Sequence, residues 1–285
     1  MNPPVPLPDS HLFTHEAMHT TFSLRLIGHD RELLAGIARE GFDLLDGLEA
    51  KLSRFVDGSD VFRINRMQAG ETLYLSEPCH QCLLLSMQAC ALTGGLFDIT
   101  LGTRIEHRKS GANGPLPPLA GRLIIHPDVP AITCEAPGRE IDLGGIGKGF
   151  ALDLIKELLL DWGASGALLA AGASTLLATG PQSWPVELAG GLATRHLALT
   201  NQALSASGTD MQGNHIVHPG GDETRTTYLS ERVWALAATA TLAEAWSTAL
   251  MLMRQGDVCA AIARQATLPA AYADFDGQVV VLKPF

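Results

Sequence analysis

The chain has 285 residues, of which 46% are hydrophobic and 18% are charged. This length suits one compact enzyme with one or two lobes, and the composition can bury a sizeable core. Thirty acidic and twenty basic side chains give a formal net charge of −10, without a dense run of Lys and Arg. Nucleic acid is therefore not an expected partner, and an anionic ligand would need a local device such as a metal ion or Gly-rich backbone amides.

The five cysteines are odd in number and scattered, which is typical of free thiols in a reducing compartment. Cys79 and Cys82 form a C-x-x-C within a predicted helix, without a second Cys or His pair, so a redox or metal role is disfavoured. The N-terminus lacks the basic region of a signal peptide, and no segment reaches the ~18 uninterrupted apolar residues of a membrane span. We expect a cytoplasmic protein without a membrane span.

The predicted elements begin after a Pro-rich lead over residues 1–16. Alternating apolar residues predict a strand over 21–28, and helical spacing then predicts a long helix from about Asp30 to Leu52. A second helix is expected from Ser76 to Gly94, because a proline in the first turn and glycines after the last turn mark helix ends. The first part of the chain therefore reads as a strand followed by helices.

The remainder mixes short strands with two more helices, over 148–162 and 241–254. Short strands are predicted at 123–125, 131–134, 167–171, 185–189, 196–200 and 233–237, and QVVVLK near the end reads as a buried strand. Strands and helices do not alternate strictly. The order therefore favours an α+β architecture with largely antiparallel sheets and packed helices over a doubly wound sheet.

The segment EIDLGGIGKGFALDLIKELL, residues 140–159, places a glycine cluster between a short strand and a helix start. Such glycines can let the backbone approach a phosphate or a metal, or they can serve only a tight turn and close helix packing. A P-loop is excluded because Gly149 follows Lys148 where a Ser or Thr is required. A dinucleotide-binding turn is excluded because Phe150 stands at its third glycine position.

This segment resembles the central motif of the ApbE family, roughly D-L-G-G-I-G-K-G-Y-A-x-D. Five further blocks follow the family's order. They are AMHT (17–20), with His19 in place of Gly; LSRFVDGSDVFRIN (52–65); GLFDITLG (95–102); SASG (205–208) with HIVHP (215–219); and EAWST (244–248). Because the ordered blocks span nearly the whole chain, they are far more specific together than any one of them.

The resemblance implies an ApbE-like domain over 17–285, a two-lobed single domain related to the T-fold. It implies a flavin-handling transferase that cleaves FAD with Mg²⁺ and attaches FMN to a Thr or Ser hydroxyl of an acceptor flavoprotein, releasing AMP. Two alternatives stay open: an FAD pyrophosphatase giving FMN and AMP, and an FAD-binding carrier or accessory protein without transfer activity.

The resemblance also implies a set of site residues. Mg²⁺ would be held by Gly145, Glu244 and Thr248; FAD would be lined by Met18, Phe55, Leu96, Phe97, Asp98, Asp142, Lys148 and Val217; and His215 would handle the proton. Glu244 stands where the family usually has Asp, and His218 replaces the Asp of H-I-I-D-P.

The chemistry of these residues agrees with the resemblance. Glu244 and Thr248 are four residues apart in a predicted helix, so their oxygens project from one face, and both are the hard ligands that Mg²⁺ prefers. Without the family context, a solvated carboxylate and an ordinary helical Thr would be the commoner interpretation. His215 titrates in a useful range, although a lone histidine is more often structural than catalytic.

Overall fold

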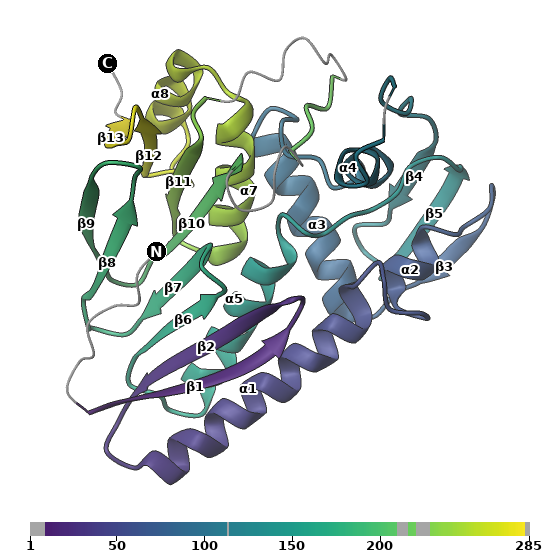
Figure 1. Cartoon of the computed structure of the whole chain (residues 1–285). Helices are drawn as coiled ribbons and strands as arrows, with labels where there is room; N and C mark the ends of the chain where they lie inside the picture. Colours follow the sequence, from purple (N-terminus) through teal and green to yellow (C-terminus); the bar gives the residue numbers. More distant parts are fainter. Residues whose placement is uncertain (1–8, 113, 210–215, 221–228, 283–285) are drawn as a thin grey trace.

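A computed structural model describes residues 9–112, 114–209, 216–220 and 229–282 of the chain (Figure 1). The strands are β1 (Ser10–Ala17), β2 (Thr20–Ile27), β3 (Thr72–Tyr74), β4 (Arg122–Ile125), β5 (Ala131–Ala136), β6 (Ala167–Ala171), β7 (Thr175–Thr179), β8 (Trp184–Ala189), β9 (Thr194–Leu199), β10 (Ala203–Gly208), β11 (Arg232–Ala237), β12 (Ala270–Phe275) and β13 (Gln278–Leu282). The helices are α1 (Arg31–Leu52), α2 (Asp60–Ile64), α3 (Glu77–Leu92), α4 (Gly102–Lys109), α5 (Gly147–Asp161), α7 (Ala240–Leu252) and α8 (Gln255–Arg264).

The main sheet has eight strands in the order β1-β2-β6-β7-β10-β11-β12-β13, and every neighbouring pair is antiparallel. A three-stranded sheet, β3-β5-β4, and the hairpin β8-β9 complete the strand pairing of the described residues. The predicted α+β class with antiparallel sheets is confirmed.

The two faces of the main sheet bury different sets of apolar side chains. Phe22, Leu24 and Leu26 of β2 join one core cluster together with side chains of α1, α5 and α7. Leu168 and Trp234 point to the opposite face, where they form a second cluster with Trp184 of the β8-β9 hairpin. Because successive side chains of a strand alternate between faces, each central strand contributes to both clusters.

The four long helices expected from apolar spacing are present as α1, α3, α5 and α7. Asp30 caps α1, since its side chain accepts hydrogen bonds from the backbone N–H groups of Glu32 and Leu33. Gly94 and Gly95, which follow α3, have φ values of 64° and 83°. This left-handed backbone is open to glycine at low cost and ends the helix.

Both ends of the main sheet differ from what the strand patterns suggest. Residues of the Pro-rich lead form β1, which pairs with β2 along its whole length. The prediction of a buried strand for QVVVLK is wrong, because β13 is an edge strand and Val280 is 40% exposed. A run of three valines signals a strand, but its place in the sheet depends on how many partners pack beside it.

Cys79 and Cys82 lie in α3, and both thiols are fully buried. Burial raises the pKa of the Cys82 thiol to about 12, and it raises the pKa of Cys79 further. Thiols that stay protonated are poor nucleophiles and poor metal ligands, so the C-x-x-C serves helix packing. Within the described residues, no helix is both long enough and apolar enough to cross a membrane.

Candidate active site

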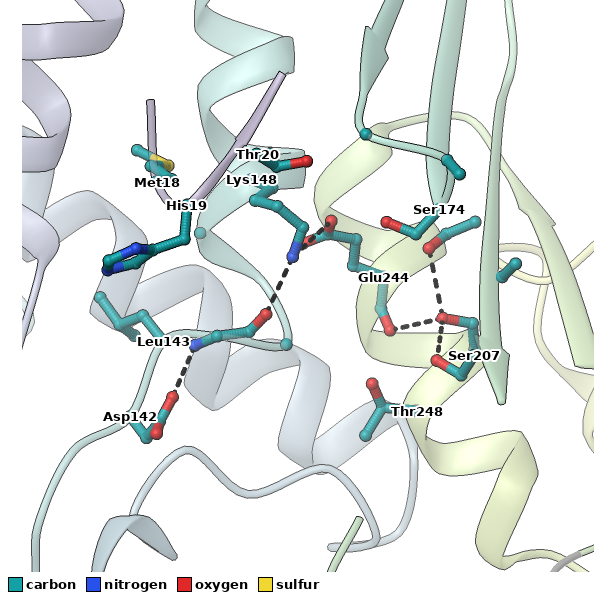
Figure 2. A pocket seen from close by; sticks show the side chains of 18 of the residues that line it. Met18, His19, Thr20, Asp142, Leu143, Lys148, Ser174, Ser207, Glu244 and Thr248 are labelled. Atoms are coloured by element: carbon teal, nitrogen blue, oxygen red, sulfur yellow. Dashed lines mark hydrogen bonds and ion pairs between the residues drawn. The ribbon is translucent and has the colours of Figure 1, made fainter. Parts of the chain in front are cut away.

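A cavity of about 390 Å³ opens where segments distant in the sequence converge (Figure 2). Its walls are the β1-β2 turn, the end of α1 with residues 53–55, the Gly-rich turn before α5, the β6-β7 turn, the end of β10 and one face of α7. These segments carry residues of five of the six sequence blocks, all except GLFDITLG at 95–102. The tertiary structure therefore brings residues from most of the motifs to one pocket.

Seven of the predicted site residues line this pocket: Met18, Phe55, Asp142, Gly145, Lys148, Glu244 and Thr248. Four others do not line it: Leu96, Phe97, Asp98 and Val217. His215 lies outside the described residues.

The side chains outside the pocket wall have structural partners. Phe97 is buried behind the Gly-rich turn, where a Cβ built on Gly145 would lie 3.2 Å from its ring. The Asp98 carboxylate accepts hydrogen bonds from the backbone N–H and the hydroxyl of Thr100. Val217 is also buried. Of these residues, Phe97 therefore packs directly behind the pocket wall at Gly145.

The Gly-rich turn is held in place by Arg54 and Asn65. Arg54 donates to the Asp142 carboxylate at 3.1 Å and to Glu140 at 2.7 Å. The Asn65 amide exchanges two hydrogen bonds with the backbone of Ile141, at 2.9 and 2.7 Å. The second Asp142 oxygen accepts from the backbone N–H of Gly144 at 2.8 Å. The block at 52–65 therefore orients the turn that forms the pocket floor.

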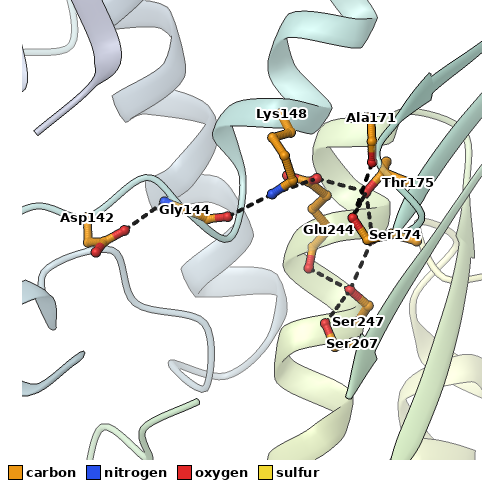
Figure 3. Close-up of polar contacts among 10 residues, drawn as sticks. Asp142, Gly144, Lys148, Ala171, Ser174, Thr175, Ser207, Glu244 and Ser247 are labelled. Atoms are coloured by element: carbon orange, nitrogen blue, oxygen red, sulfur yellow. Dashed lines mark hydrogen bonds and ion pairs between the residues drawn. The ribbon is translucent and has the colours of Figure 1, made fainter. Parts of the chain in front are cut away.

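Glu244 is the central acidic group of the pocket, and it is only 4% exposed. Its Oε1 atom accepts a hydrogen bond of 2.8 Å from the Thr175 hydroxyl and lies 3.5 Å from Lys148 Nζ (Figure 3). Its Oε2 atom is buried and has no hydrogen-bond partner among the described residues. A buried carboxylate oxygen without a partner is costly, so this geometry contradicts the solvated-carboxylate interpretation and suits a cation ligand.

Three residues that line the pocket, Glu244, Thr248 and Gly145, carry oxygen atoms of the kinds that Mg²⁺ binds. The Thr248 hydroxyl follows Glu244 by one helical turn, and a Cβ built on Gly145 would lie 3.4 Å from Thr248 Oγ1. Carboxylate, hydroxyl and backbone carbonyl oxygens are the hard ligands that Mg²⁺ accepts, usually together with water or substrate phosphates. In the described part of the chain, no cluster of three or more His, Cys, Asp or Glu could hold a metal. A site here would therefore depend on neutral oxygens beside a single carboxylate.

A row of hydroxyl groups continues from Glu244 along the pocket wall (Figure 3). Thr175 contacts Ser205 at 3.2 Å, Ser205 contacts Ser247 at 3.3 Å, and Ser247 contacts Ser207 at 2.9 Å. Hydroxyls can donate to phosphate oxygens and accept from a cation's water shell. The row therefore offers a polar wall without adding negative charge.

The charge of the pocket differs from that of the whole protein. Four cationic side chains line it (Arg54, Lys109, Lys148 and Arg232), together with three carboxylates (Glu49, Asp142 and Glu244). The chain as a whole carries a formal charge of −10. The one-charge cationic excess of the lining favours an anionic ligand in this cavity, although the whole chain is acidic.

Asp153, the last residue of the central motif, fixes the start of α7. Its carboxylate accepts hydrogen bonds from the backbone N–H groups of Ala240 and Thr241, both at 2.9 Å, and from the Thr241 hydroxyl. Burial raises the pKa of Asp153, and these hydrogen bonds oppose the rise. The helix that carries Glu244 and Thr248 is therefore capped from α5.

We expect the Asp153→Asn variant to lose about 1–2 kcal/mol of unfolding free energy, because an amide offers one acceptor to several donors. The pKa of Asp153 is higher in the folded state than in the unfolded state. At pH values between these two pKa values, the folded protein therefore binds a proton that the unfolded chain does not. Its contribution to stability therefore falls as the pH rises through that window. Denaturant titrations should show a smaller difference between wild type and variant at about pH 7 than at about pH 4. A difference that grows with pH would contradict this assignment.

Several pocket residues were not predicted individually. Arg54, Ser205, Ser207 and Ser247 lie within the recognised blocks, so the signal was present in the motifs that contain them. Lys109, Ser174 and Arg232 lie outside those blocks, and only the fold brings them to the pocket.

The chain is similar to known proteins in both sequence and fold. The ApbE family model matches residues 18–272. The FAD:protein FMN transferase of Klebsiella pneumoniae (strain 342) is 21% identical over 303 aligned residues, covering 97% of this chain and 93% of that protein. The apo form of the Pseudomonas stutzeri flavinyl transferase ApbE superposes with a TM-score of 0.79 at 22% identity, covering 95% and 94% of the two chains. The flavin transferase ApbE of Vibrio cholerae gives 0.81 at 18% identity, covering 95% and 97%.

Proposed function

Because the chain belongs to the ApbE family, we propose that it is an Mg²⁺-dependent FAD:protein FMN transferase. It would cleave the pyrophosphate of FAD, attach FMN through a phosphoester to a Thr or Ser hydroxyl of an acceptor flavoprotein, and release AMP. The observation that carries the proposal is the buried Glu244 Oε2 atom without a hydrogen-bond partner, in a cavity that Thr248, Gly145 and four cationic side chains also line.

The residues of the pocket suggest a division of roles. Glu244, Thr248 and the Gly145 carbonyl would hold Mg²⁺, which when bound supplies positive charge that neutralises the pyrophosphate. Lys148 would donate to a phosphate oxygen of FAD; its Nζ lies 3.1 Å from the Gly144 carbonyl oxygen and 3.5 Å from Glu244 Oε1, which supports this role. The bond between the FMN phosphorus and the bridging oxygen of the pyrophosphate would break. AMP would leave with that oxygen, and the acceptor hydroxyl oxygen would bond to the FMN phosphorus.

The acceptor hydroxyl must lose a proton as it attacks phosphorus. We assign this proton transfer to His215, on the sequence pattern alone, because an imidazole titrates near neutral pH. All five cysteines are free thiols, which supports a reducing compartment, and we therefore propose a cytoplasmic acceptor.

Mixing the purified chain with FAD, Mg²⁺ and a candidate acceptor domain, followed by intact mass spectrometry of the acceptor, tests the proposal. Transfer predicts a covalent FMN adduct on a Thr or Ser together with one AMP per adduct. FMN and AMP without an adduct, across a panel of acceptors, would instead identify a pyrophosphatase. FAD that binds and stays intact would identify a carrier.

A further inference from the structure

The turn between β1 and β2 carries a strained backbone at the pocket. Met18 and His19 have φ values of 50° and 59°, although neither is a glycine, and Ala17 pairs with Thr20 on either side of them. A two-residue hairpin turn of this kind needs positive φ at both positions, for which Asn and Gly are preferred. Strained backbone of this kind concentrates at functional sites, where the side chain is needed in that position.

The turn is anchored against a second turn of the sheet. A Cβ built on Gly172 would lie 2.4 Å from the Thr20 hydroxyl, so the two turns touch closely. His19 also lines the cavity. Its side chain thus projects from a fixed position.

His19 faces an unusually exposed aromatic ring. The centroids of His19 and Phe55 are 6.3 Å apart and their planes meet at 82°, while Phe55 is 64% exposed. Phe55 is held by the Arg54 guanidinium, 5.6 Å from its ring centroid, and by a hydrogen bond from its backbone N–H to Ser53 Oγ. The two rings form a right-angled corner at the rim of the pocket, open to solvent.

Figure 2 shows His19 beside Met18 and Leu143, on the side of the pocket away from Ser207 and Thr248. A dinucleotide carries its pyrophosphate in the middle and a flat heteroaromatic ring at each end. A pyrophosphate near Glu244 and Lys148 would therefore extend one ring toward the corner. A flat ring in that corner stacks on one aromatic face and meets the edge of the other, which are the two favourable aromatic geometries.

We propose that His19 is a substrate-binding residue and that His19 and Phe55 together contact one of the two aromatic ring systems of FAD, the isoalloxazine or the adenine. This inference rests on the proposed function, because it takes the dinucleotide as the ligand. A glycine at position 19 would suit the backbone better and would lack the ring. The histidine therefore exchanges turn stability for a contact with substrate.

Binding of FAD to the His19→Gly variant tests this inference, measured by isothermal titration calorimetry with EDTA so that no turnover occurs. We expect the variant to bind FAD roughly 3- to 10-fold more weakly, as the loss of one aromatic contact predicts. Its melting temperature should stay the same or rise, because glycine relieves the positive φ. His19→Phe should restore binding. His29→Ala, which removes an 89% exposed histidine outside the pocket, should leave binding unchanged.

Titrations with FMN and with ADP identify the ring, because the affinity of only one of them should fall in His19→Gly. Equal FAD affinity of wild type and His19→Gly would overturn the inference and leave the proposed function standing. Failure of the wild-type protein to bind FAD at all would overturn both.

Discussion

We expect replacement of Glu244 by Gln to lower FMN transfer by about 10³-fold or more, because a metal acting as Lewis acid is worth several kcal/mol. The variant keeps the size of the side chain and an oxygen for Thr175, but it loses the negative charge at the buried position that would hold Mg²⁺. Steady-state transfer rates over a range of Mg²⁺ concentrations, with calorimetric titration of Mg²⁺, measure the effect.

Two further variants complete the test. Glu157→Gln changes a 64% exposed glutamate on α5, and it should leave transfer and Mg²⁺ affinity unchanged. Glu244→Asp restores the residue that the family usually has, but its shorter side chain gives up the reach to Thr175 and Lys148, so we expect an intermediate rate. Undiminished transfer in Glu244→Gln would remove Glu244 from the metal site.

The largest effect on stability is expected at Gly149, where α5 meets the start of α7. A Cβ at this position would lie 2.4 Å from the Ala240 carbonyl oxygen and 2.8 Å from the Thr241 nitrogen. Both contacts are with backbone, so no side chain can rotate away. We expect Gly149→Ala to lose about 3 kcal/mol of unfolding free energy, and the melting temperature to fall by roughly 5–10 °C.

Gly47→Ala provides the matched control for Gly149→Ala. Gly47 lies within α1, and a Cβ there would meet nothing within 4 Å. This substitution should raise the unfolding free energy by about 0.5–1 kcal/mol, because alanine restricts the unfolded chain and suits a helix. Calorimetric melting of both variants measures the two changes in stability. A Gly149→Ala protein as stable as wild type would show that the two helices can separate without cost.

Close packing at Gly149 also bears on the site, because α7 carries Glu244 and Thr248. Asp153 caps the same helix end from the same helix, so the central motif both shapes the Gly-rich turn and sets the position of α7. A helix shift of less than 1 Å would move the carboxylate relative to Gly145. We therefore expect Gly149→Ala to lose transfer activity even at temperatures where it remains folded.

The sequence alone determined the long helices, because their apolar residues repeat at the spacing of a helical turn. The four long helices follow from apolar spacing with clear start and stop residues, as at Asp30 and at Gly94 with Gly95. Short elements were missed, among them α2, α4 and α8, because a few residues carry too little periodic signal. The ordered motifs also identified the family and seven residues that line one pocket.

Only the tertiary structure decided which of these residues share a site, how deeply each is buried and which hydrogen bonds it forms. Burial of Glu244, with one oxygen bound by Thr175 and the other without a partner, depends on β7 and α7, which are more than sixty residues apart. Phe97 lies behind the pocket wall, and Asp98 binds Thr100 and does not line the pocket, because packing between distant segments decides which face of a segment is buried. The corner of His19 and Phe55 likewise joins a hairpin turn to the end of a helix. Contacts between distant segments leave no periodic pattern in the chain, and they arise only when the core is packed.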